Sequence, residues 1–365
     1  MINEWKENTE NLRPSRKKPI FHVNTKLRHY LKGYGREVKL PASYNDLMRF
    51  TYSLPLKDKN NNPTLWETVT YDMREWEYLR ESLVQMYAIL KTEGDLSFTS
   101  HLDVARIDFC SFGNSQPFRI RIVNKFNDNH DHYYVKQADA SRVYGLELEH
   151  LLSPNRITFL TNRNTLIEEH IPGIPGDVFA EQQLYDPKTN IIRFAKEFVK
   201  FNERCFVRLL GDMRSYNFVV NVTPDIDEDF QYRIRAIDFD QQSYEGKKNL
   251  YLPQFFKENK PFVEAVMKHL DKESIAQYQA EERTMMTFRL VSSRYRVKEL
   301  LDIMHDDDIS KHEKIHQLRV ELADHFHEII FLRCKTMGQI VKTQLKQTLR
   351  KSLAVIPKTT SRFAD

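Results

Sequence analysis

The stretch from Leu209 to Gln241 constrains the fold of this chain more than any other part of the sequence. It contains two short apolar runs, Phe218 to Val222 and Tyr232 to Ile237, whose β-branched content is typical of buried strands. An acidic, turn-rich segment, Thr223 to Asp229, separates them. The sequence therefore predicts two strands joined by a loop, with polar residues at their ends.

The polar residues beside these strands are of the types that phosphoryl transfer requires. Asp212 lies five residues before Asn217, which directly precedes the first strand, and Asp238 directly follows the second. Phosphoryl transfer uses one carboxylate to orient the attacking hydroxyl, and an Asn and a second Asp to hold Mg²⁺ against the nucleotide phosphates. Asp212 is therefore the candidate base, and Asn217 and Asp238 are candidate metal ligands. Asp240 is a further candidate ligand.

The GDxxxxN spacing, followed by IDFD, resembles the protein-kinase-like superfamily. It is more similar to the aminoglycoside-phosphotransferase and atypical kinase branches than to the HRDxxxxN of ordinary protein kinases. Two positions depart from the family pattern: Leu210-Gly211 stands where a His or Arg usually precedes the catalytic Asp, and Asp240 replaces the Gly of the DFG-type triplet. Neither change removes the base or a metal ligand.

The resemblance implies an α+β, two-lobed protein-kinase-like fold, with an antiparallel small-lobe sheet, a mostly helical large lobe and helical extensions at both ends. We expect residues 1–95 to form a basic arm and a helical N-terminal extension, 96–172 the small lobe, and 173–365 the large lobe with a C-terminal helical extension. Apolar residues return at helical spacing from Ser43 to Leu54 and from Thr64 to Leu90. Three strand-like runs then follow: Ala105 to Phe112, Phe118 to Phe126, and His132 to Val135.

The resemblance also assigns residues to nucleotide binding. Lys136 ends the third strand-like run, where a kinase-like fold places the lysine that reaches the α- and β-phosphates. A helix beginning near Ser141 carries Glu147 and Glu149, either of which could pair with that lysine. Periodicity alone does not choose between them, although Glu147 shares a helical face with Val143 and Leu151.

A short segment after the strand ending at Glu169 is predicted to join the two lobes. Its sequence, EEHIPGIPGDVF, contains closely spaced Pro and Gly residues that prevent a helix. In the family that this chain resembles, backbone groups of the corresponding segment form hydrogen bonds with the adenine edge. The resemblance therefore makes Glu169, His170 and Ile171 candidates for nucleotide binding. Plain surface charge is an equal interpretation of Glu169 and His170.

Composition excludes several classes of protein. The 55 basic residues are nearly balanced by 51 acidic ones, so the net charge of +4 does not indicate a nucleic-acid-binding protein. The three cysteines are widely spaced, which supports neither a disulfide framework nor a zinc site. No apolar run is long enough for a membrane span and no apolar signal core stands at the N-terminus, so we expect a cytoplasmic protein.

Two basic segments lie outside the predicted catalytic region. The first, near Arg13 and Lys18, has the pattern of a solvated arm, with a site for an acidic partner as the alternative. The second is a basic amphipathic helix near the C-terminus. It either packs on its own protein or contacts an anionic lipid surface or a partner helix. Its basic residues are Lys335, Lys342, Lys346, Arg350 and Lys351.

The sequence therefore predicts an ATP- and Mg²⁺-dependent phosphotransferase that acts on a hydroxyl of a small molecule or protein. The residue pattern does not identify the substrate, because loops and helices that vary within such a fold select it. Two alternatives stay open: a pseudokinase that binds nucleotide or a partner without turnover, and a kinase-like enzyme that transfers AMP.

Overall fold

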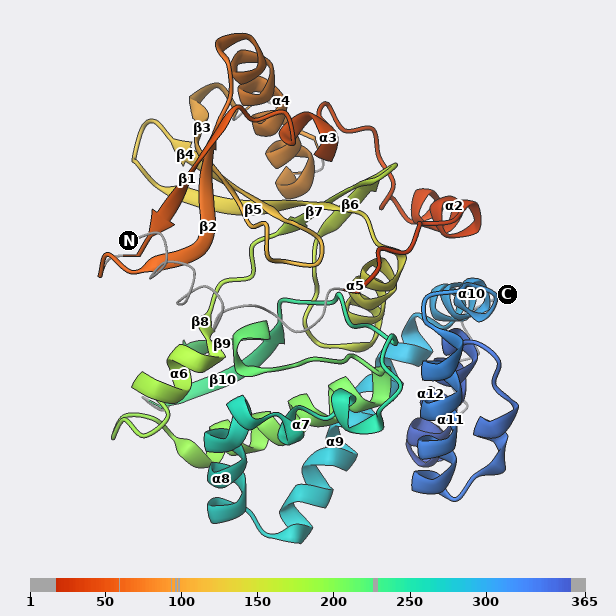
Figure 1. The fold of residues 1–365 in the computed structure, drawn as a ribbon. Helices are drawn as coiled ribbons and strands as arrows, with labels where there is room; N and C mark the ends of the chain where they lie inside the picture. Colours follow the sequence, from red (N-terminus) through yellow and green to blue (C-terminus); the bar gives the residue numbers. More distant parts are fainter. Residues whose placement is uncertain are drawn as a thin grey trace. The chain divides into compact units, whose positions relative to one another are not determined.

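In the computed structural model the chain divides into two compact units, and each unit takes residues from two separate parts of the sequence (Figure 1). The first unit comprises the residues up to Ala140 together with Ile157–His170, and the second comprises Ser141–Arg156 and the residues from Ile171 onward. The structure describes residues 18–355, except 59, 93, 96, 98 and 226–228. The basic residues Arg13, Arg16 and Lys17 of the predicted N-terminal arm lie outside the described residues.

The first unit is built on a seven-stranded sheet in which every neighbouring pair of strands is antiparallel. The strand order is β1-β2-β3-β4-β5-β7-β6. The chain is therefore α+β, as the sequence predicts. The strands are β1 (Tyr52–Lys57), β2 (Pro63–Thr70), β3 (Leu102–Phe109), β4 (Phe118–Asn124), β5 (His130–Gln137), β6 (Phe159–Asn162) and β7 (Thr165–Glu169).

Alternation along the central strands gives this sheet one apolar face. In β4, Phe118, Ile120 and Ile122 are buried while the residues between them are partly exposed. Helix α4 (Met73–Thr92) contributes Leu79, Leu83 and Met86 to the same core. The Tyr133 hydroxyl donates a hydrogen bond of 2.9 Å to the Leu83 carbonyl, which ties the helix to β5. Figure 1 shows α4 lying over this sheet.

The helical spacing from Ser43 to Leu54 and from Thr64 to Leu90 predicts helix correctly for α3 and α4, but it is wrong for the segments that form β1 and β2. Helices α2 (Thr25–Gly33) and α3 (Tyr44–Leu47) are short, and two strands, β1 and β2, follow before α4 begins. Tyr52 pairs with Thr70 across this hairpin, and Glu67 of β2 pairs with Phe109 of β3. Threonine and valine in β2 favour a strand, and cross-strand pairing outweighs the helical spacing of its apolar residues.

The second unit contains a three-stranded antiparallel sheet, in the order β10-β9-β8, and most of the long helices. Strands β9 and β10 are the two strands that the sequence predicts after Asn217. The strands are β8 (Ile174–Pro175), β9 (Phe218–Pro224) and β10 (Phe230–Ala236). The helices are α5 (Ala140–Leu152), α6 (Gly176–Gln182), α7 (Ile191–Arg208), α8 (Lys260–His269), α9 (Lys272–Ser292), α10 (Arg294–His305), α11 (His312–Phe326) and α12 (Met337–Val355), and the 3₁₀ turn η6 spans Ile329–Arg333.

Helix α7 is the centre of the second unit. Its residues Phe194 and Phe198 lie 5.1 and 5.3 Å, ring centre to ring centre, from Phe262 of α8. Phe201, one turn further along α7, lies 5.0 Å from Phe218 at the start of β9. Large aromatic side chains bury the most apolar area per residue, so this cluster fixes β9 and α8 against α7. Among the described residues, no helix combines the length and apolar character needed to cross a membrane.

The crossing of α10 and α12 depends on a glycine, and it supplies a test of this packing. A methyl group at Gly338 of α12 would lie 1.9 Å from the Met304 carbonyl oxygen of α10, a backbone atom that has no rotamer to change. Gly338→Ala is therefore expected to lower the free energy of unfolding by about 3 kcal/mol or more. Gly33→Ala is the matched control, because its added methyl group meets nothing within 4 Å. Urea unfolding should show little loss, or a gain, for the control; equal losses for both variants would contradict the packing argument.

Candidate active site

The loop that carries Asp212 is held in place by main-chain bonds on both sides. Leu209 ends α7 in the left-handed region, with a φ of 54°. Gly211 N then donates to the Gln241 carbonyl at 3.2 Å, and Asp212 N donates to the Leu250 carbonyl at 3.0 Å. A side chain at Gly211 would approach that same Gln241 oxygen to 3.0 Å, so a larger residue here would require the neighbouring backbone to shift.

Asp212 itself has a strained backbone, with a φ of 59°, and a carboxylate that one arginine contacts. Arg214 Nε donates to Asp212 Oδ1 at 2.8 Å, while Arg214 Nη1 donates to Glu258 Oε1 at 2.8 Å. Burial raises the pKa of Asp212, and the hydrogen bond and positive charge of Arg214 oppose that rise. A carboxyl group in a left-handed loop residue, partly desolvated beside a cation, is a common arrangement at functional sites.

Asn217 connects this loop to the β9–β10 hairpin. Its Nδ2 donates to the Asp212 carbonyl at 2.7 Å. Its own carbonyl accepts from Ile237 N at 3.0 Å, which extends the ladder beyond the Phe218–Ala236 pair. Because Asp238 directly follows Ile237, the hairpin register brings Asn217 and Asp238 to neighbouring positions at one end of the two strands.

Asp238 and Asp240 share a buried arginine that the sequence analysis did not single out. Arg142 of α5 donates through Nη1 to Asp238 Oδ1 at 2.9 Å and to Asp240 Oδ1 at 2.8 Å. Asp240 N also donates to Asp238 Oδ1 at 3.0 Å. The Asp240 side chain is 6% exposed, whereas that of Asp238 is 35% exposed. Asp238 is therefore the acid of this pair that reaches solvent.

The oxygen donors on this hairpin fit a hard cation. Asn217 uses its amide nitrogen within the protein, which directs its amide oxygen away from that bond, and Asp238 presents a partly exposed carboxylate. Mg²⁺ commonly takes one or two protein oxygen ligands and completes its shell with water and phosphate. The described part of the chain holds no cluster of three or more His, Cys, Asp or Glu residues suited to a metal ion. Asp240 is buried against Arg142, and its role as a metal ligand stays a prediction.

Lys136 lies in the first unit, on β5, where its ammonium group is almost fully buried. Its Nζ donates to Glu168 Oε2 of β7 at 2.8 Å, and these side chains are 8% and 6% exposed. Lys136 pairs with Leu166 and Tyr134 pairs with Glu168, so the two charged residues are diagonal neighbours on one face of the sheet. Predicting this ion pair requires the register between β5 and β7, which the sequence alone does not provide.

Glu147 and Glu149, the predicted alternatives for pairing with Lys136, are both buried in the second unit. Arg296 of α10 donates to both carboxylate oxygens of Glu147, at 2.8 and 2.8 Å. Arg208 of α7 forms an ion pair with Glu149. These partners explain why residues 141–156 belong to the second unit rather than to the predicted lobe 96–172. A pairing with Lys136 would join the two units, and it stays a prediction.

The candidates for nucleotide binding near residue 170 are divided between the units. Glu169 Oε1 accepts from Thr158 N at 2.8 Å, so its carboxylate serves the sheet of the first unit. His170 Nδ1 lies 3.2 Å from the Tyr134 hydroxyl, and burial lowers the pKa of the imidazole. Ile171 is buried and begins the second of the two segments that form the second unit. Adenine binding by these three residues stays a prediction.

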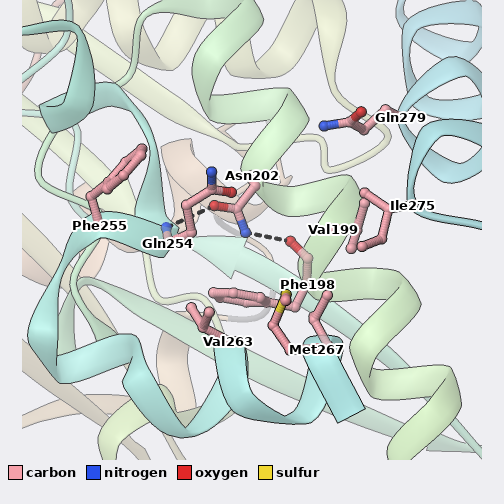
Figure 2. A pocket seen from close by; sticks show the side chains of 10 residues that line it. Phe198, Val199, Asn202, Gln254, Phe255, Val263, Met267, Ile275 and Gln279 are labelled. Carbon is pink, nitrogen blue, oxygen red and sulfur yellow. Dashed lines mark hydrogen bonds between the residues drawn. The ribbon is translucent and has the colours of Figure 1, made fainter. Parts of the chain in front are cut away.

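An apolar cavity of about 370 Å³ lies among α7, α8 and α9 of the second unit (Figure 2). At its wall, Asn202 Oδ1 accepts from Gln254 N at 2.8 Å and Asn202 Nδ2 donates to the Phe198 carbonyl at 2.7 Å. None of the residues that line it belongs to the predicted catalytic or metal-binding set. Asn259 bonds the carbonyls of both Met213 and Pro253 at 2.8 Å, which links the Asp212 loop to the turn that carries Gln254.

Comparison with known proteins adds no family to these observations: no family model matches the chain, and no curated protein does either.

Three residues that the sequence analysis did not consider contact the predicted acids or their partners. They are Arg142, Arg214 and Glu258. Arg214 stands two residues after Asp212, so its proximity was available from the sequence, whereas Arg142 and Glu258 come from distant segments.

A double-mutant cycle tests whether Arg142 and Asp240 form one buried unit. Arg142→Met leaves Asp240 buried without this cation and is expected to cost about 3–5 kcal/mol of stability. Asp240→Leu should cost less, since Arg142 retains Asp238. The double variant, measured by urea unfolding, should be more stable than the sum of the single losses implies. Strictly additive losses would show that the two side chains are not coupled.

Proposed function

We propose that this protein is an ATP- and Mg²⁺-dependent phosphotransferase acting on a hydroxyl group of a small molecule or protein. The proposal rests on one observation: the β9–β10 hairpin and the loop before it connect the three predicted residues Asp212, Asn217 and Asp238. The amide of Asn217 holds the carbonyl of Asp212, and the β9–β10 register sets Asn217 beside the residue preceding Asp238. The GDxxxxN resemblance supports the same assignment.

In the proposed reaction Asp212 acts as the base. Its carboxylate accepts the proton of the substrate hydroxyl as that oxygen bonds to the γ-phosphorus and the bond to ADP breaks. Arg214, 2.8 Å from Asp212, favours the ionised carboxylate and fixes its orientation. Positioning and electrostatics supply most of the catalysis in such reactions, so a rigid loop held by main-chain bonds is suited to this role.

Asn217 and Asp238 would hold Mg²⁺ through their side-chain oxygens, and the bound ion would neutralise negative charge on the phosphates. Arg142, which is itself buried, orients Asp238 as a positioning residue. Lys136 is proposed to contribute to phosphate binding from the first unit, as the resemblance implies. Glu168 would then hold its ammonium group in the ionised form.

One observation favours a second candidate, a pseudokinase that binds nucleotide without turnover. Arg142 already places a positive charge between Asp238 and Asp240, which lessens the negative charge available to a metal. Transfer of AMP rather than the phosphoryl group uses the same residues. Mass spectrometry of the products formed from isotope-labelled ATP distinguishes all three outcomes: added phosphate, added AMP, or no product.

Asp212→Asn is the variant that tests the base. The amide has the same shape but accepts no proton, so nucleotide binding should persist while transfer falls by about 10²- to 10⁴-fold. Asp128→Asn is the matched control, because Asp128 has a similar φ of 56° on an exposed turn. Retention of full transfer by Asp212→Asn would remove Asp212 from the mechanism.

Thermal unfolding of the same variant checks that lost activity is not lost folding. Because the folded-state pKa of Asp212 is raised above 3.8, the folded protein holds that proton more tightly than the unfolded chain does. Stability therefore decreases as pH rises from 3.8 through the folded-state pKa of Asp212, and the full cost is present above that pKa. Asp212→Asn avoids this cost and should unfold at an equal or higher temperature at pH 7, with the difference shrinking in acid.

Asp238→Asn tests the metal site by binding alone. Loss of one negative charge from a partly exposed ligand should weaken the Mg²⁺-dependent part of ATP binding by at least about tenfold. Titration calorimetry with and without Mg²⁺ measures that part directly. Asp177→Asn is the control in the same unit, since the Asp177 side chain bonds the adjacent Val178 amide. If Mg²⁺ enhances ATP binding equally in wild type and Asp238→Asn, Asp238 does not hold the ion.

A further inference from the structure

A second cavity, of about 280 Å³, lies between α10, η6 and the first half of α12 in the second unit. Its lining combines cations and apolar groups, and it lies apart in sequence from the residues around Asp212. Figure 1 shows α10 and α12 side by side in the C-terminal part of the chain, and the two helices are in direct contact. The residues that give the cavity its character are His305, Ile330, Arg333, Lys342, Thr343 and Lys346.

The turn η6 presents aliphatic side chains to solvent from a fixed base. Its central residue, Phe331, is fully buried, with its ring stacked 5.4 Å from that of Phe326. The flanking Ile329, Ile330 and Leu332 are 72%, 45% and 43% exposed. Three large aliphatic side chains in four residues would ordinarily be buried, and here one aromatic anchor holds them at the surface.

Positive charge surrounds these side chains. Residues 328–351 contain six cations and one carboxylate, Glu328. Lys342 pairs with Asp302 of α10 at 2.6 Å, and Arg350 lies 3.9 Å from Glu328. Arg333 and Lys346 are exposed and make no ion pair with any carboxylate that the structure describes. Both also line the cavity together with Ile330, so two cations and one of the three exposed aliphatic side chains of η6 lie around one hollow.

We propose that η6 and the N-terminal half of α12 form a membrane-docking surface for bilayers rich in anionic phospholipid. Ile329, Ile330 and Leu332 enter the boundary between headgroups and acyl chains, while Arg333 and Lys346 contact lipid phosphates. Basic side chains with long aliphatic stems suit that boundary, because the stem lies in the apolar layer and the charge stays with the headgroups. The proposal is independent of ATP binding.

The composition of the surface favours a bilayer over an acidic protein. The centres of protein interfaces are enriched in aromatic residues, whereas the exposed side chains of η6 are aliphatic and offer no hydrogen bond. A fluid headgroup layer accepts such side chains at any lateral position and adds about 1 kcal/mol for each nearby cation. Anionic lipid headgroups would therefore provide the negative charge that matches the cations of α12.

Vesicle sedimentation with the full chain tests the proposal. The protein should bind vesicles of three parts phosphatidylcholine to one part phosphatidylserine, release at high salt, and bind vesicles of phosphatidylcholine alone far more weakly. The double variant Arg333→Glu/Lys346→Glu should lose affinity by at least about 20-fold. Ile329→Ser/Leu332→Ser should also lose affinity, without any change in charge.

A control with the same change in net charge separates this surface from general attraction. Lys268→Glu/Lys272→Glu alters two exposed lysines of α8 and α9 and should bind vesicles as the wild type does. The proposal is overturned if this control loses as much affinity as the η6–α12 variant. It is also overturned if wild-type protein binds both vesicle types equally or neither, whether or not the surface captures an acidic protein. Thermal unfolding of each variant confirms that the exposed substitutions leave the fold intact.

Discussion

The buried charges of α5 are the constraint on which the second unit depends. Arg142, Glu147 and Glu149 are each 2% exposed or less, within one helix of 13 residues. An ionised side chain in the protein interior costs several kcal/mol unless a partner of opposite charge and good geometry meets it. The partners come from the loop after β10, from α10 and from α7, three segments far apart in the sequence. Pairing the buried charges of α5 therefore fixes the positions of all three segments.

This requirement acts directly on the candidate active site. The partner of Arg142 is the acidic pair at the end of β10, so the same ion pairs that bury α5 also orient Asp238. Asp212 is stabilised differently, by main-chain bonds and by an arginine two residues away. The two acids proposed for chemistry are thus supported by separate sets of contacts, and a change in one set need not displace the other. At Asp238, the ion pair that stabilises the fold also sets the orientation of the carboxylate. At Asp212, in contrast, burial disfavours the ionised form of the carboxylate.

The sequence predicted local structure well where a segment's own pattern decides it. The strand beginning at Phe218, the strand ending at Glu169 and the helix beginning near Ser141 appear at or within a few residues of their expected bounds. It failed for β1 and β2, where pairing with the neighbouring strand outweighs helical spacing. The neighbourhood of Asn217 and Asp238 followed from two adjacent strands, which is a local inference.

Partners that lie far apart along the chain were beyond the sequence analysis. The pairs Lys136–Glu168 and Arg142–Asp240 depend on sheet register and helix placement, respectively. A charged residue in an apolar run indicates that an oppositely charged partner is needed, but the sequence does not identify that partner. The predicted pairing of Lys136 with a glutamate of α5 shows the difficulty, because each glutamate of that helix has an arginine of the second unit beside it.

The ion pair between Glu147 and Arg296 has a consequence for the synthesis of this protein. The two residues are 149 positions apart, so the ribosome makes the acid long before its partner. At about 5–20 residues per second, Glu147 waits roughly 7–30 s for Arg296. During that interval α5 cannot be buried as it is in the finished molecule, and its apolar face, with Val143 and Leu151, stays available to chaperones or to other nascent chains. The synthesis of α10, rather than the emergence of the β9–β10 hairpin, therefore sets the earliest time at which α5 can be buried with its partner.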